Sequence, residues 1–66
     1  MFKEFYIFKD INEVKLRKVF INTEMIEVID INNPDFIMIR LVSGVIYYLK
    51  HTDENLNRLM LGRAYS

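Results

Sequence analysis

The sequence predicts an α+β fold, a small antiparallel five-strand β-meander followed by one short C-terminal helix. Residues 36–50 contain two apolar runs on either side of Ser43-Gly44, a pattern typical of a tight β-hairpin. Residues 53–61 carry apolar side chains at helical spacing after Thr52, a residue type that favours the start of a helix. With 66 residues, positions 1–66 are expected to form a single small domain.

Short apolar runs predict the first three strands, at about residues 4–9, 14–21 and 25–31. In the second, the alternation of apolar and polar residues slips by one position after Lys18, which predicts a β-bulge near Arg17. In the third, strict alternation places Ile26 and Val28 on one face and Ile29 on the other.

The fourth and fifth strands are expected at about residues 36–42 and 45–50, after a turn centred on Pro34. Alternation divides the fourth strand into two faces that are both largely apolar. One face carries Ile37, Ile39 and Leu41, and the other carries Phe36, Met38, Arg40 and Val42. This pattern predicts a strand that is covered on both sides or that meets a partner on one of them.

The helix is expected to begin after Thr52 and to end near Gly62, a residue type that favours the end of a helix. Leu56, Leu59 and Met60 form one apolar stripe along it. Because a helix this short is not stable alone in water, the stripe must dock on the sheet or on another subunit.

The composition excludes several kinds of site. The chain has no Cys and one His, so a disulfide, a thiolate metal site and a polyhistidine site are all impossible within one chain. No cofactor is therefore expected. Lys plus Arg and Asp plus Glu both total 9, and this balance is unusual for a nucleic-acid-binding domain. The sequence shows no apolar run of 18 residues and no secretory signal, so we expect a cytoplasmic protein with no membrane partner.

The order of elements resembles that of the FlbD family of small proteins encoded near flagellar genes. The resemblance rests on Ile21-Asn22, Ile26, Ile29, Ile39-Arg40-Leu41, Ser43-Gly44 and residues 47–50, followed by a short helix with an acidic first turn. It covers roughly residues 5–60, although the family's Val-Lys-Glu-Ser is here Leu49-Lys50-His51-Thr52. The resemblance implies a small cytosolic module without enzymatic activity.

Six apolar residues are candidates for a protein interface, because 52% of the chain is hydrophobic and a small sheet does not easily bury so much. Tyr47 and Tyr48 are adjacent, so they point to opposite faces and one of them is expected to lie at the surface. The helix stripe is more often core than interface, but in so small a chain it could serve as both if the helix packs across a two-fold axis. The candidate interface residues are Phe36, Met38, Tyr48, Leu56, Leu59 and Met60.

Polar residues offer weaker candidates. Lys15, Arg17 and Lys18 form a basic cluster that suits either nucleic-acid contact or protection of an exposed strand, and the second is favoured. His51 lies between the last strand and the helix, where a role as a solvated junction residue is favoured over catalysis. The acidic residues of the turns and of the first helical turn match no metal-binding spacing.

Binding is therefore expected rather than catalysis. The first hypothesis is a regulatory protein-interaction module that self-associates, most simply as a dimer, and binds a larger protein. The alternative is a phage- or plasmid-type inhibitor of a host enzyme. A nucleic-acid-binding module is the third and least favoured of these binding functions, because the net charge is zero.

Overall fold

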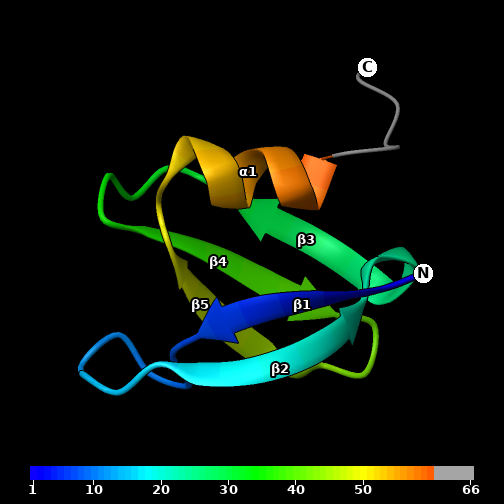
Figure 1. Cartoon of the computed structure of the whole chain (residues 1–66), viewed down its shortest axis with the longest axis horizontal. Coiled ribbons are helices and arrows are strands. Elements are labelled where there is room, and N and C mark those ends of the chain that lie inside the picture. Colours follow the sequence, from blue (N-terminus) through cyan, green and yellow to red (C-terminus); the bar gives the residue numbers. More distant parts are fainter. Residues whose placement is uncertain (61–66) are drawn as a thin grey trace.

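The computed structural model describes residues 1–60, which form two antiparallel sheets and a C-terminal helix (Figure 1). The chain is α+β, as predicted, but the prediction of a single five-strand meander is wrong. The helix end expected at residues 61 and 62 lies outside the described residues. The elements are β1 (Phe2–Ile7), β2 (Arg17–Asn22), the 3₁₀ helix η1 (Thr23–Met25), β3 (Ile26–Asp30), β4 (Phe36–Leu41), β5 (Ile46–Lys50) and α1 (Asp53–Met60).

The meander is broken between β2 and β3, where η1 changes the direction of the chain. The side-chain oxygen of Asn22 accepts the backbone N–H of Glu24 at 3.2 Å and so caps η1. β1 pairs with β2, while β3, β4 and β5 form the second sheet in that order. The two sheets meet where Phe8 and Tyr48 exchange backbone hydrogen bonds of 2.7 and 2.9 Å. The first strand therefore contacts the last, and the described chain approaches a barrel rather than a flat sheet.

The core lies between the two sheets and beneath α1, which runs along one side of them (Figure 1). Alternate residues of each strand point into it, as a half-buried sheet requires. Ile37 and Ile39 of β4 are fully buried, so the face predicted for them is confirmed. The other buried apolar residues are Phe5, Ile7, Phe8, Ile21, Ile26, Leu49 and Leu59.

A β-bulge occurs in β3, and not near Arg17 as the sequence suggested. β2 pairs with β1 in unbroken register from Arg17 onward, because the residues before it are not part of the strand. In β3, Ile26 pairs with Leu41 and Val28 with Arg40, so Glu27 is the additional residue. The bulge turns Ile26 and Ile29 toward the core and leaves Val28 and Asp30 on the outer face.

The β4–β5 connection is the tight hairpin that the sequence predicted. Gly44 adopts φ +92°, a left-handed conformation that disfavours residues with a side chain, and its N–H donates to the carbonyl of Leu41 at 2.9 Å. After β5, the hydroxyl oxygen of Thr52 accepts the N–H of Asn55 at 3.1 Å, which is the N-cap expected there. Leu59 then anchors α1 in the core.

Candidate functional site

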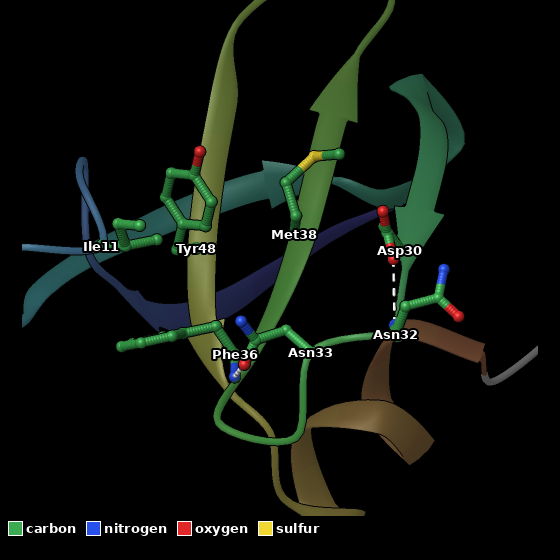
Figure 2. A pocket seen from close by; sticks show the side chains of 7 residues that line it. All are labelled: Ile11, Asp30, Asn32, Asn33, Phe36, Met38 and Tyr48. Carbon is green, nitrogen blue, oxygen red and sulfur yellow. Dashed lines mark hydrogen bonds between the residues drawn. The ribbon is translucent and has the colours of Figure 1, made fainter.

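The outer face of the β3–β4–β5 sheet carries a half-buried row of side chains from three strands. Asp30 pairs with Met38, and Met38 pairs with Tyr48, so the three side chains lie side by side on one face. Phe36 lies two residues before Met38 and therefore shares that face. Figure 2 shows Met38 between Tyr48 and Asp30.

These side chains line a shallow hollow of about 340 Å³, which we call the outer hollow. Its floor is apolar and part of its rim is polar, a combination common in binding sites. Ile11 closes one side from the loop that follows β1, close to Tyr48 in Figure 2. The lining residues are Ile11, Asp30, Asn32, Asn33, Phe36, Met38 and Tyr48.

The floor of the outer hollow is supported by aromatic packing with Phe8, which pairs with Tyr48 and so lies on the same face. The rings of Phe8 and Phe36 meet edge to face, with their centroids 5.7 Å apart and their planes at 90°. Phe8 is buried and is fixed by its backbone bonds to Tyr48. Phe36 is thereby held in place before any partner binds, which reduces the entropy lost on binding.

The rim is formed by the turn that precedes β4, and side chains fix its shape. The Asn33 side-chain oxygen accepts the N–H groups of Asp35 and Phe36, at 2.7 and 3.2 Å. His51 Nδ1 lies 2.6 Å from the carbonyl oxygen of Asn33, and the His51 N–H donates to the carbonyl of Asp35 at 3.0 Å. Because a carbonyl oxygen can only accept, Nδ1 must carry the proton. His51 therefore joins this turn to the β5–α1 junction.

One carboxylate stands at the rim. Asp30 Oδ1 accepts the N–H of Asn32 at 2.9 Å, the dashed line in Figure 2, in a local turn of the kind that Asp favours. This bond holds the side chain on the outer face, where the β3 bulge has placed it. The outer hollow thus combines an apolar floor with a negative charge at its rim. Such a surface suits an apolar side chain that lies next to a cationic one.

The structure divides the six predicted interface residues into two groups. Phe36, Met38 and Tyr48 come together in the outer hollow, while Leu56, Leu59 and Met60 lie on α1. Leu59 is fully buried and Leu56 packs against the core, so the core interpretation accounts for both. Leu59 offers no surface to a partner in this conformation.

The basic cluster is largely occupied by ion pairs within the chain. Arg17 Nε lies 3.0 Å from Glu13 Oε1, and Lys18 Nζ lies 3.1 Å from Glu4 Oε1, while Lys15 is exposed. The hydrogen bond to the Glu4 carboxylate, helped by its charge, raises the pKa of Lys18 above its usual 10.5. Two of the three cations thus already face a carboxylate, which weakens the case for a nucleic-acid surface.

Neither a metal centre nor a membrane span is found in the described chain. Residues 1–60 hold no group of three or more His, Asp or Glu side chains placed to bind a metal ion. Within the same residues, no helix is long and apolar enough to cross a membrane.

Sequence reasoning missed Ile11 and Asp30 as members of the site. Ile11 stands among polar turn residues, and an apolar side chain in a turn was the available signal. Asp30 was interpreted only as a turn residue; strict alternation would place it on the same face as Ile26, and the bulge at Glu27 turns it to the outer face instead.

Comparison with protein-family models, with curated proteins and with solved structures gave no match. The resemblance to the FlbD family therefore stays a prediction, and the case for function rests on the surface itself.

Proposed function

We propose that this protein is a non-enzymatic protein-binding module and that the outer hollow is its binding site. One observation carries the proposal: three half-buried apolar side chains, from two strands of one sheet, line a preformed depression with a carboxylate at its rim. Interfaces commonly use such aromatic and Met side chains as anchors inside a polar rim.

The partner that fits is a protein segment presenting an apolar side chain next to Lys or Arg. The apolar side chain would rest on Met38 and Phe36, and the cation would lie near the Asp30 carboxylate. A charge-assisted contact of this kind adds specificity and accelerates association more than it adds affinity. The chain has no net charge of its own, so such steering depends on the local charge at Asp30.

The hypothesis of a phage- or plasmid-type inhibitor is one form of this function, in which the bound protein is an enzyme. A nucleic-acid-binding function has less support. Of the four aromatics near the basic cluster in sequence, Phe5 and Phe8 are buried and so unavailable to stack on bases. Tyr6 and Phe20 are exposed, but the cations Arg17 and Lys18 already pair with Glu13 and Glu4.

The test is affinity capture with the wild-type protein and three variants. Met38→Lys places a charge in the middle of the hollow and is expected to abolish capture of the partner. Asp30→Asn keeps an oxygen for the Asn32 N–H but removes the charge, and it should weaken capture and reduce its salt dependence. Val14→Lys is the matched control, since Val14 is 95% exposed and does not line the hollow.

A protein captured by the wild type and by Val14→Lys, and lost with Met38→Lys, supports the proposal, provided that circular dichroism shows Met38→Lys to be folded. If that protein is an enzyme, an activity assay with added wild-type protein separates inhibition from simple binding. A partner captured equally well by Met38→Lys would refute the outer hollow as the binding site.

A further inference from the structure

The outer edge of β2 has no strand neighbour within residues 1–60, because β2 pairs with β1 alone. The hydrogen-bond pattern shows which backbone groups face this edge. Thr23 N–H donates to the carbonyl of Met1, in continuous register with the pairs Phe2–Asn22 and Lys3–Ile21. Odd-numbered residues of β2 therefore direct their N–H and C=O toward β1, and even-numbered residues direct theirs away.

The same alternation in β1 supports this assignment. Phe8, an even-numbered residue, turns its N–H and C=O away from β2 and bonds them to Tyr48 of β5. Lys18 and Phe20 consequently present backbone donors and acceptors at the unpaired edge of β2. An edge of this kind is a template for another strand.

Unpaired edges are often protected by charged side chains, and the sequence suggested that role for Arg17 and Lys18. In the structure, these side chains are held by Glu13 and Glu4 of the same chain, at 3.0 and 3.1 Å. Their charges are thus partly neutralised. The middle of the edge is apolar, because Phe20 is 67% exposed there.

A second hollow of about 480 Å³, which we call the edge hollow, lies beside this strand. Phe2, Phe20, Met25 and Val42 line it, and each of them is an exposed large apolar side chain. Its walls are more apolar than those of the outer hollow, and it lies at the end of β4, next to Leu41 and Val42, whereas the outer hollow lies at the start of β4. It has room for an aromatic side chain.

We propose that a second copy of this chain pairs with β2 through its own β2, antiparallel about a two-fold axis, with Phe20 opposite the partner's Phe20. A two-fold antiparallel pairing must place one residue opposite its own copy. Centring the pairing on Phe20 joins the β1–β2 sheets of the two copies into one sheet. It also gives each edge hollow an aromatic side chain from the other copy.

Self-complementarity selects a second copy over an unrelated strand. In this register, Val19 lies opposite the partner's Ile21 and Phe20 opposite its own copy, so three successive positions pair apolar with apolar, while Lys18 lies opposite the partner's Asn22. Centring on Val19 instead would set Lys18 against the partner's Phe20, and centring on Ile21 would set Phe20 against the partner's Asn22. Apolar residues oppose one another along the middle of the strand only in the register centred on Phe20.

Self-pairing through β2 extends the proposed function by naming a second copy of the chain as a partner, and it uses a surface separate from the outer hollow.

The first measurement is the solution mass by light scattering or sedimentation from low to high micromolar concentration. We expect the wild type to reach twice the monomer mass as concentration rises. Phe20→Lys should stay monomeric, or raise the dimer Kd by about tenfold or more, because two like charges would face each other. Val14→Lys adds the same charge elsewhere and should dimerise like the wild type.

The second measurement fixes the register. Paired residues that exchange both backbone bonds have Cα atoms about 5.5 Å apart, a separation that a disulfide spans. Because the chain has no Cys, Phe20→Cys should form a covalent dimer under mild oxidation, and Val14→Cys should not. Absence of this cross-link, or a wild type that stays monomeric at high micromolar concentration, would overturn edge pairing. Capture through the outer hollow would then still stand, because Met38→Lys tests it independently.

Discussion

Replacing Leu59 by Ala tests how α1 is held on the two sheets. α1 has eight residues, too few to be stable alone, and Leu59 is its one fully buried residue. The truncation removes apolar atoms from a site enclosed by both sheets, so a cavity remains. Such Leu→Ala changes cost about 2–5 kcal/mol. A domain of this size has about 3–5 kcal/mol of stability in all, so we expect Leu59→Ala to be largely unfolded at room temperature.

Urea unfolding followed by circular dichroism measures this loss. Asn57→Ala is the matched control, since Asn57 is exposed on the same helix and its free energy of unfolding should change by less than about 0.5 kcal/mol. If Leu59→Ala lost less than about 1 kcal/mol of unfolding free energy with an unchanged m-value, burial of this side chain could not be what holds the helix, and the assignment of Leu59 to the core would be refuted.

Three further changes probe the hairpin, the outer hollow and an ion pair. Gly44→Ala should cost about 1–2 kcal/mol in thermal unfolding, because φ is +92° and no atom lies near enough to compensate; an unchanged midpoint would contradict this. Phe36→Leu should lose about 0.5–1.5 kcal/mol through the lost edge-to-face contact with Phe8, measured by urea unfolding against wild type. The pKa of Lys18 is raised above 10.5 by Glu4, so its stabilising contribution is complete below that pH and is lost as pH rises further. Lys18→Met should therefore show a smaller fall in unfolding free energy above pH 10.5, and an identical fall would refute the role of the pair.

Much of the strand arrangement was predictable from local chemistry. The β4–β5 hairpin follows from Gly44, the start of the helix from Thr52, and the faces of β4 from alternation, which is why these elements agree with the structure. Each depends on neighbouring residues alone. The division into two sheets was not predictable in this way, because it depends on η1 turning the chain and on Phe8 meeting Tyr48, which is far along the sequence.

The outer hollow was predictable in part for the same reason. Alternation placed Phe36, Met38 and Tyr48 on faces that the register then brings together. It failed for Asp30, because the bulge changes the face of the later residues of its strand. Leu59, on the helix, was a candidate for the interface as well as for the core, because apolar residues at helical spacing are consistent with both.

The bulge at Glu27 accommodates one additional residue without exchanging the faces that pairing with β4 gives its strand. Because Ile26 and Val28 already pair with the consecutive residues Leu41 and Arg40, deleting Glu27 would straighten the strand and still leave Ile29 toward the core and Asp30 on the outer face. Loss of a single codon there would remove the Glu27–Arg40 ion pair and keep the acid at the rim. A relative that lacks this residue can therefore form the same hollow, because the pairing with β4, more than the length of the segment, sets which side chains face it.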